Sequence, residues 1–291
     1  MTIANKRFNY LVVGGDSYVG SILSSKLSVS GNLVLSTTRR ATNTRNKIFL
    51  DLTAKEFSGE AKETIKNSEV IFFLAGITST GAIESNPASS WNVNVEGLNR
   101  ILDLIEGNTK LVYLSSTRVF DGSKSDFTVE DLPNFGSHYG REKAHCENLL
   151  LESEYNYVVV RLGKILDVNR GYISTYIDRI LAGQKIYVSK KRYVSPTDVD
   201  SLTLELATKI SYINRQIVHF FPVKALSFYD LFTHIARFLK ISSELVQVQR
   251  KDLDRDKYDV LNNSTELFQE RDLDEILANY FRRRYSYKSF L

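Results

Sequence analysis

The sequence contains little cysteine, no long apolar run and only a weak excess of one charge. Cys146 is the single cysteine among 291 residues, so no disulfide can form within the chain, and such low usage suits a reducing compartment. No stretch approaches the ~18 consecutive apolar residues of a membrane span. The polar segment Met1–Asn9 lacks the apolar core of a signal peptide. These absences predict a cytoplasmic protein without a membrane partner.

Two further absences narrow the class of ligand. The formal net charge is +4 over the whole chain, which is too weak a basic excess to predict nucleic-acid binding. The four histidines show no ligand spacing with acids or with the cysteine, so we predict no metal site. What remains is a globular chain of ordinary composition, long enough for one or two domains, whose mild positive charge suits an anionic small molecule.

A glycine-spaced loop follows the first apolar run of the chain. The run Phe8–Val13 reads as a buried parallel strand, the loop Gly14–Gly20 follows it, and Ser21–Leu27 has helical spacing. A strand, a glycine loop and a helix in this order make a phosphate site, because the helix N-terminus presents free N–H groups and a positive dipole end to a pyrophosphate. The residues expected to bind the dinucleotide here are Gly14, Asp16, Ser17, Tyr18 and Val19.

The second predicted strand, Leu33–Ser36, bears on which dinucleotide is bound. In a dinucleotide fold the end of this strand faces the adenosine ribose, where an acidic residue holds the 2′-hydroxyl and an arginine accommodates a 2′-phosphate. The strand pattern shows no acid there, whereas Arg39 and Arg40 follow Thr38. This pattern favours NADP(H) and leaves NAD(H) open. Two solvated loop arginines are the alternative interpretation.

Three more apolar runs complete an alternation of strands and helices. Lys47–Leu52, Glu69–Gly76 and Lys110–Ser116 read as strands, with helical patterns between and after them. This alternation predicts an α/β fold with a doubly wound parallel sheet, the Rossmann fold, whose ligands bind at the carboxyl ends of the strands. Further cofactor contacts are expected from Asp51, Leu52, Leu74, Ala75, Gly76 and Asn94. Asn94 has two interpretations, which the sequence leaves open: an interior polar group that bridges strands, or a member of a proton relay.

Tyr139 and Lys143 form a chemically usable pair four residues apart. The residues after them read as a helix, and positions i and i+4 lie on the same helix face. A cation beside a tyrosine favours the phenolate, so we predict a lowered tyrosine pKa. An exposed pair on a solvated helix face is the alternative. Because Ser116 ends the fifth predicted strand, the serine, the tyrosine and the lysine can converge on one crevice.

Five segments together carry a family resemblance. They are Gly14–Gly20, Leu74–Gly76, Asn94–Gly97, Ser115–Gly122 and Tyr139–Lys143. This set resembles the short-chain dehydrogenase/reductase superfamily, in the extended branch of NAD-dependent epimerases and dehydratases that acts on nucleotide sugars. The later Ser-Pro-Thr segment, within Tyr193–Val199, is similar to that of dTDP-4-dehydrorhamnose reductases.

Three departures from the family pattern bear on this resemblance. Ser17 stands where the family loop usually has a third glycine, and Leu162 stands where proline usually follows the arginine of a later strand. The related 4,6-dehydratases have an acidic pair after the catalytic hydroxyl. This chain has Thr117 and Arg118 instead, which argues against dehydration.

The resemblance implies a reaction and the residues that perform it. Tyr139 would donate a proton to the developing alkoxide, and Ser116 would hold that oxygen by a hydrogen bond. Lys143 would bind the nicotinamide ribose and lower the tyrosine pKa. The expected substrate contacts are Thr78, Ser116, Thr117, Arg118 and Arg192.

We therefore interpret the chain as an NADP-dependent reductase of a nucleotide-activated 4-keto-6-deoxysugar, of a kind used in polysaccharide biosynthesis. A nucleotide-sugar epimerase that retains NAD(P) is one alternative, and a non-catalytic NADP-binding regulatory subunit is another. We expect a dinucleotide-binding Rossmann domain at residues 1–163. A smaller α/β region at 164–291 would mainly bind substrate, with segments at about 190–220 returning to the Rossmann sheet. The sequence leaves open whether the chain forms a homodimer.

Overall fold

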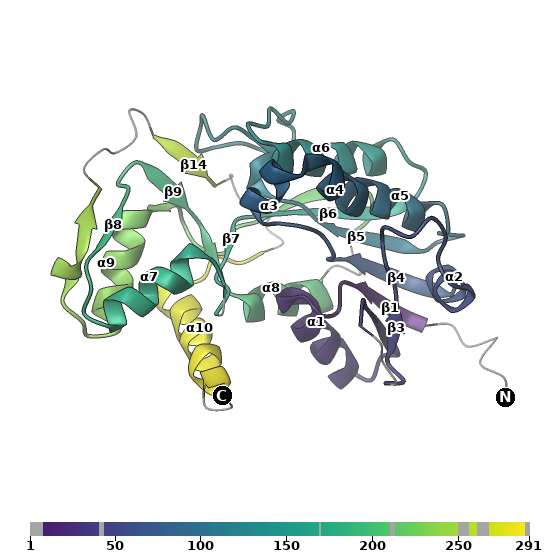
Figure 1. Cartoon of the computed structure of the whole chain (residues 1–291), viewed down its shortest axis with the longest axis horizontal. Helices are drawn as coiled ribbons and strands as arrows, with labels where there is room; N and C mark the ends of the chain where they lie inside the picture. Colours follow the sequence, from purple (N-terminus) through teal and green to yellow (C-terminus); the bar gives the residue numbers. More distant parts are fainter. Residues whose placement is uncertain are drawn as a thin grey trace. The chain divides into compact units, whose positions relative to one another are not determined.

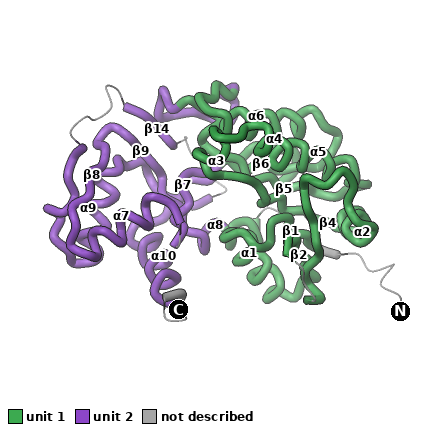
Figure 2. The backbone as a smooth tube through the Cα atoms, viewed as in Figure 1, with its two compact units in different colours: residues 1–121, 133–161, 203–218 green, residues 122–132, 162–202, 219–291 purple. Residues whose placement is uncertain are grey.

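The chain forms two units, each assembled from segments that are distant in the sequence (Figures 1 and 2). The computed structural model describes residues 8–40, 44–168, 170–209, 213–249, 256–260 and 268–288. Unit 1 comprises residues 1–121, 133–161 and 203–218, and unit 2 comprises residues 122–132, 162–202 and 219–291. The segment 203–218 therefore belongs with the N-terminal part of the chain. Which ligand each unit binds stays a prediction.

A seven-stranded sheet forms the centre of unit 1. Its strands are β1 (Phe8–Val13), β2 (Val34–Thr38), β3 (Lys47–Phe49), β4 (Ser68–Phe73), β5 (Lys110–Leu114), β6 (Asn156–Leu162) and β11 (Gln216–Phe220). β1 pairs in parallel with β2 and β4, and the parallel sense continues to β3 on one side and through β5 to β6 on the other. The strand order is β11-β6-β5-β4-β1-β2-β3, so the direction of winding reverses beside β1. The predicted doubly wound Rossmann fold is thereby confirmed.

The interior strands are apolar along their length because helices cover both faces of the sheet. Leu11 and Val13 of β1, with Ile71 and Phe73 of β4, are at most 2% exposed. These side chains lie in one core with buried residues of α2 (Gly59–Lys66), α5 (Gly97–Leu102) and α6 (His138–Leu151). Figure 1 shows α1 (Tyr18–Val29) on the other face.

The element boundaries differ from the predicted ones. β3 ends at Phe49 rather than Leu52, because Asp51 turns the chain by accepting hydrogen bonds from the backbone N–H and the hydroxyl of Thr53, at 2.9 and 2.8 Å. β4 and β5 also end before the predicted positions, so the tips of both predicted strands lie in loops. One of the helical stretches between the strands begins as a π-helical segment, η2 (Asn92–Glu96), which α5 follows.

A buried ion pair joins α6 to β6. Glu147 is 0% exposed and Arg161 is 1% exposed. The Arg161 guanidinium donates from Nη2 to the Glu147 carboxylate at 2.7 Å and from Nε to both carboxylate oxygens at 3.1 and 3.2 Å. The hydroxyl of Ser115 donates to the same carboxylate at 2.5 Å. One buried carboxylate therefore connects α6, β6 and the end of β5.

The described part of unit 2 contains three small sheets and several helices. β7 pairs in parallel with β10, β8 with β13, and β9 lies between β12 and β14. The strands are β7 (Lys164–Ile165), β8 (Ile186–Val188), β9 (Arg192–Val194), β10 (Pro196–Thr197), β12 (Leu226–Ser227), β13 (Val246–Val248) and β14 (Lys257–Asp259). The helices are α7 (Gly171–Leu181), α8 (Val199–Thr208), which continues into unit 1, α9 (Phe228–Phe238) and α10 (Leu273–Lys288). Among the helices of the described residues, none has both the length and the apolarity that a membrane span requires.

Arg284 attaches the C-terminal helix α10 to α7. Its side chain is 1% exposed and donates to the hydroxyls of Tyr280, at 2.7 Å, and Ser174, at 2.8 Å. It also forms an ion pair with Asp178 of α7. Tyr280 and Phe281 of this helix are buried as well, whereas Arg282 and Tyr285 are exposed.

We predict that Glu147→Ala lowers the free energy of unfolding by about 3–5 kcal/mol, because it leaves Arg161 buried without a counter-charge. Urea denaturation followed by circular dichroism measures this change. Glu152→Ala, at the exposed end of the same helix, is the control and should change it by less than about 0.5 kcal/mol. Equal effects at the two positions would contradict the role given to the ion pair.

Candidate active site

The first turn of α6 packs against the backbone that follows β5. Ser137 caps α6 by accepting a hydrogen bond from the backbone N–H of Gly140 at 3.1 Å. A Cβ at Gly140 would lie 2.0 Å from the carbonyl oxygen of Arg118, so a side chain at this position cannot be accommodated without a shift. This close approach brings Tyr139 of α6 beside Ser116.

Tyr139 is partly buried and lies within reach of a hydrogen bond with Ser116. Burial raises the pKa of the phenol to about 12, and the negative charge of Glu142 adds to the increase. A hydrogen bond with Ser116 and the positive charge of Arg118 oppose it. The predicted lowering of this pKa by Lys143 is therefore wrong, because burial and Glu142 dominate. The phenol keeps its proton at neutral pH.

Lys143 is held at the end of β5. Its ammonium donates to the carbonyl of Leu114 at 2.8 Å and lies 4.4 Å from the centre of the Tyr113 ring. The ring of Tyr139 is 5.8 Å away, so the two members of the pair do share surroundings, as their spacing predicts. Lys143 is 9% exposed, and burial lowers its pKa against the opposing charges of acidic neighbours on α6.

Asn94 connects η2 to the loop after β4. Its amide oxygen accepts from the backbone N–H of Ile77 at 2.7 Å, and its amide nitrogen donates to the carbonyl of Ile77 at 2.9 Å. The same nitrogen donates to Glu142 at 2.6 Å. Of the two interpretations left open by the sequence, these contacts favour the bridging polar group.

Glycines allow the loops after β1 and β4 to approach closely at the carboxyl edge of the sheet. Gly14 has φ of +93°, and a Cβ there would lie 2.7 Å from the backbone nitrogen of Ala75. A Cβ at Gly20 would lie 2.3 Å from the carbonyl oxygen of Gly14. Ser17 caps α1 by accepting from the backbone N–H of Gly20 at 3.0 Å. In this glycine cradle, residues 14–20 with Ala75, the loop after β1 lies directly against the loop after β4.

The other predicted contacts of this region lie within the cradle or next to it. Tyr18 and Val19 form the first turn of α1, and Leu74 and Gly76 flank Ala75.

An acid from the loop after β1 lies beside the end of β2, which the pattern of the strand itself does not reveal. Asp16, in the cradle, accepts hydrogen bonds from the ammonium of Lys47 at 2.7 Å and from the hydroxyl of Thr38 at 2.5 Å. These bonds lower the pKa of Asp16, so its carboxylate is ionised at neutral pH. Arg39 and Arg40 are exposed at the same strand end. The expectation that no acid stands there is therefore wrong, because the fold supplies one from the glycine loop.

Two predicted cofactor contacts, Asp51 and Leu52, already have partners within unit 1. The carboxylate of Asp51 accepts hydrogen bonds from Thr53 in its own turn, which lowers the pKa of Asp51. The side chain of Leu52 is buried in the core, and its carbonyl accepts from Arg100 at 2.8 Å.

The predicted substrate contacts divide between the units. Thr117 is buried and Arg118 half-buried after β5, and Thr78 is exposed in the loop after β4, all within unit 1. Arg192 belongs to unit 2, where it donates to the carboxylate of Asp259 at 2.9 and 2.7 Å.

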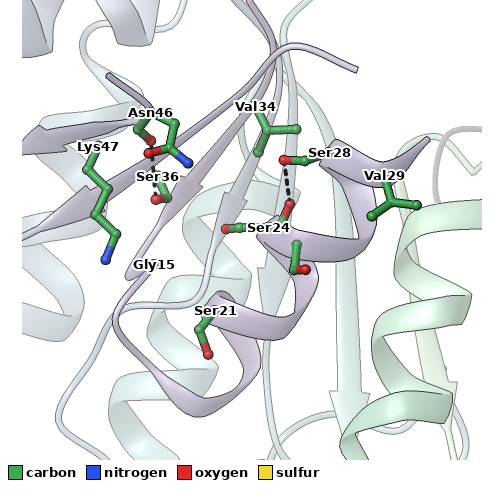
Figure 3. A pocket seen from close by; sticks show the side chains of 10 residues that line it. Gly15, Ser21, Ser24, Ser28, Val29, Val34, Ser36, Asn46 and Lys47 are labelled. Carbon is green, nitrogen blue, oxygen red and sulfur yellow. Dashed lines mark hydrogen bonds between the residues drawn. The ribbon is translucent and has the colours of Figure 1, made fainter. Parts of the chain in front are cut away.

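A hollow of about 470 Å³ lies along α1 and is lined in part by Gly15 of the cradle (Figure 3). Its lining is rich in serine hydroxyls, with Ser36 of β2 and with Asn46 and Lys47 at the start of β3. The hydroxyl of Ser28 donates to the carbonyl of Ser24 at 2.8 Å, so part of this polar lining is satisfied locally. None of the three predicted catalytic residues lines the hollow.

Sequence reasoning missed Lys47 and Glu142, which the structure places against predicted site residues. The available signal for Glu142 is its spacing. It precedes Cys146 and Leu150 by four and eight residues, so it lies on the buried stripe of α6 where a charge is unusual. Within the described ranges, no three histidine, cysteine or acidic side chains are grouped as metal ligands.

A family model and two curated relatives match parts of the chain. The family model described as RmlD substrate binding domain matches residues 8–265. Methionine adenosyltransferase 2 subunit beta of Rattus norvegicus is 29% identical over 122 residues, which are 40% of this chain and 36% of that protein. dTDP-4-dehydrorhamnose reductase of Sinorhizobium fredii (strain NBRC 101917 / NGR234) is 22% identical over 169 residues, which are 55% of this chain and 57% of that protein. The chain thus spans about a third to just over half of the length of these relatives.

Solved structures share the fold over nearly the whole chain. MoeE5 in complex with UDP-glucuronic acid and NAD has a TM-score of 0.76 at 23% identity, covering 94% of this chain and 99% of that one. UDP-N-acetylglucosamine 4-epimerase from Methanobrevibacter ruminantium M1 has a TM-score of 0.79 at 19% identity, covering 97% and 99%. At these identities the likeness establishes the fold alone.

We predict that Gly140→Ala lowers the free energy of unfolding by about 1–3 kcal/mol, because the new methyl group meets the Arg118 carbonyl and must displace α6. Gly59→Ala is the matched control, since nothing lies within 4 Å of a Cβ at that position. It should leave the free energy unchanged or raise it by up to about 1 kcal/mol. Chemical denaturation of both variants tests the prediction, and a neutral Gly140→Ala would contradict it.

Proposed function

The chain belongs to the RmlD substrate binding domain family, and from this premise we propose that it is an NADP-dependent reductase of a nucleotide-activated 4-keto-6-deoxysugar. The membership confirms the resemblance to the extended short-chain dehydrogenase/reductases. The observation that carries the proposal is the convergence of Tyr139, Ser116 and the buried Lys143, with the Lys143 ammonium 5.8 Å from the centre of the Tyr139 ring. Carbonyl reduction needs a proton donor and a group that stabilises the carbonyl oxygen, and the tyrosine and the serine can supply them.

The proposed roles divide the work between the cradle and the end of β5. The glycine cradle and the N-terminus of α1 would hold the pyrophosphate of the cofactor, and Lys143 would hold its nicotinamide ribose. When bound, NADPH supplies a hydride to the keto carbon of the sugar. Tyr139 gives its phenolic proton to the oxygen of that carbon, and Ser116 donates a hydrogen bond to the same oxygen as negative charge develops there. The product is an alcohol, and the tyrosine regains a proton from solvent.

The raised pKa of Tyr139 supports the reductive direction. A phenol with a pKa of about 12 is protonated at neutral pH and can therefore donate its proton without prior activation. An epimerase must first remove a proton from a sugar hydroxyl, which calls for the phenolate. The electrostatic surroundings of Tyr139 therefore suit a proton donor.

A nucleotide-sugar epimerase that retains NAD(P) is the second candidate. The same three residues would serve it, and a protein of similar fold is a UDP-N-acetylglucosamine 4-epimerase. Such an enzyme would change the configuration of the sugar without net consumption of NADPH.

A non-catalytic NADP-binding subunit is the third candidate. The relative from Rattus norvegicus is named as a subunit of methionine adenosyltransferase. A protein of this kind needs the cradle and has no use for a proton donor, so it would bind NADPH without turnover.

For the cofactor, we propose NADP(H), with NAD(H) as the alternative. Arg39, Arg40 and Lys47 bring three positive charges to the end of β2, and Asp16 brings one negative charge. A 2′-phosphate there would meet a net positive region. Asp16 would accept a hydrogen bond from a ribose 2′-hydroxyl, which is the feature that keeps NAD(H) in consideration.

We predict that Tyr139→Phe lowers kcat by about 10²–10⁴-fold, because the reaction loses its proton donor. NADPH binding should persist, since the cradle is unchanged. The assay follows NADPH oxidation by the purified protein with a panel of dTDP- and UDP-linked 4-keto-6-deoxysugars. Tyr187→Phe, at an exposed tyrosine of unit 2, is the control.

Nearly intact activity in Tyr139→Phe would contradict the assigned role. Sugar conversion without NADPH oxidation would identify the epimerase, and binding without any conversion would identify the subunit.

We predict that the double variant Arg39→Ala/Arg40→Ala weakens NADPH binding by at least about tenfold, the equivalent of 1.4 kcal/mol, because it removes two cations from the proposed 2′-phosphate site. NADH binding should change much less, and NADH therefore serves as the control ligand. Dissociation constants for NADPH and NADH, measured from the fluorescence of the reduced cofactors, test this prediction. An equal loss for both cofactors would place the arginines outside this site.

A further inference from the structure

Glu142 is a buried carboxylate to which the proposed reaction gives no role. It lies on α6 between Tyr139 and Lys143 and is 3% exposed. One carboxylate oxygen accepts a hydrogen bond from the hydroxyl of Ser90, and the other accepts one from the amide of Asn94 at 2.6 Å. Both carboxylate oxygens are therefore paired inside unit 1.

Asn94 connects Glu142 to the loop after β4, which packs against the glycine cradle. It holds the backbone N–H and carbonyl of Ile77 at 2.7 and 2.9 Å. A Cβ at Gly76 would lie 2.9 Å from the amide oxygen of Asn94, so the loop after β4 packs directly on this side chain. The same loop contains Ala75, whose backbone packs against Gly14. A continuous set of contacts thus leads from α6 to the cradle.

A second contact from α6 reaches the same point. The thiol of Cys146 donates to the backbone carbonyl of Asn94 at 3.4 Å. Asn94 lies in η2, where the chain has π-helical rather than α-helical geometry, and such segments concentrate at functional sites. The contacts of Glu142 and Cys146 therefore fix η2 to α6.

We propose that Glu142 is a positioning residue of the active site, which fixes the catalytic helix α6 against the loop after β4 and so sets Tyr139 and Lys143 relative to the glycine cradle. This inference rests on the proposed reductase function where activity is the readout. It goes beyond that function because it assigns a role to a residue outside the proposed proton transfer.

The charge of Glu142 also acts on both members of the catalytic pair. After burial itself, its negative charge is the main influence that raises the pKa of Tyr139, and it opposes the lowering of the pKa of Lys143 by burial. A side chain that only filled space would have neither effect. The other titratable groups that face the pair are Tyr113 of β5, Arg118 in the 3₁₀ turn after β5, and Cys146 and Glu147 of α6.

Glu142→Gln separates the charge from the hydrogen bonds. The amide oxygen can still accept from Asn94, and the amide nitrogen can donate to the hydroxyl of Ser90, so the contacts of α6 are kept. Because Glu142 raises the pKa of Tyr139, its neutralisation lowers that pKa, and the proton-donating form is lost at lower pH. We expect the alkaline limb of the pH profile of kcat/KM to move to lower pH than in the wild type.

Glu142→Ala removes the hydrogen bonds as well. We expect a further loss of kcat, on the order of 10²-fold, because Tyr139 and Lys143 are no longer fixed relative to the cradle. NADPH binding should weaken in this variant and persist in Glu142→Gln. Glu152→Gln, at the exposed end of α6, is the control and should leave the pH profile in place.

The outcomes separate this inference from the proposed function. If the wild type reduces no sugar, the reductase proposal fails, and the NADPH affinities of the two variants still test the role of Glu142. Equal affinities in the wild type, Glu142→Gln and Glu142→Ala would then overturn it. If the wild type is active, an unmoved alkaline limb in Glu142→Gln overturns it. Should Glu142→Ala not fold, the pH profile of Glu142→Gln remains decisive.

Discussion

Charges buried along one face of α6 must be paired, and this requirement fixes the helix in place. Glu142, Lys143 and Glu147 are each at most 9% exposed, and each has partners on a different element. Glu142 contacts η2, Lys143 contacts the end of β5, and Glu147 contacts β6. Removing one partner of a buried charge costs several kcal/mol, so no alternative placement of the helix that broke these contacts would be stable. The stability of the protein and the geometry of the proposed catalytic pair, Tyr139 and Lys143, therefore come from the same set of contacts.

The order of the strands brings the remaining parts of the site together. β1 and β4 are neighbours at the point where the winding reverses, and their glycine-containing loops form the cradle. β5 is the next strand beyond β4, so Ser116, which follows it, lies near the same edge of the sheet. Parallel strands present their carboxyl ends on one side, and the proposed reacting groups lie near that side. The glycine at position 140 completes the arrangement, because it lets α6 reach the backbone after β5.

Most of the fold could be predicted from local patterns, whereas the electrostatics of the site could not. Continuous apolar runs predict buried parallel strands, and Gly14–Gly20 predicts the turn that the structure contains. The sequence pattern does not show that an acid lies beside the end of β2, because Asp16 precedes its partner Thr38 by 22 residues. The sequence also does not show that the pKa of Tyr139 is raised rather than lowered. The spacing identifies Lys143 as a neighbour, but only the three-dimensional structure reveals how far burial and Glu142 outweigh it.

The assembly of unit 1 from three separated segments has a consequence for synthesis on the ribosome. β6 ends at Leu162, and its outer neighbour β11 begins at Gln216. At 5–20 residues per second, the 53 residues between these positions take roughly 3–11 s to be translated. During that interval the backbone groups on one edge of β6 have no strand to pair with, which is the condition in which exposed strands associate with other chains. Codon usage or chaperone binding over residues 163–215 should therefore influence the yield of folded protein more than the same factors acting elsewhere in the chain.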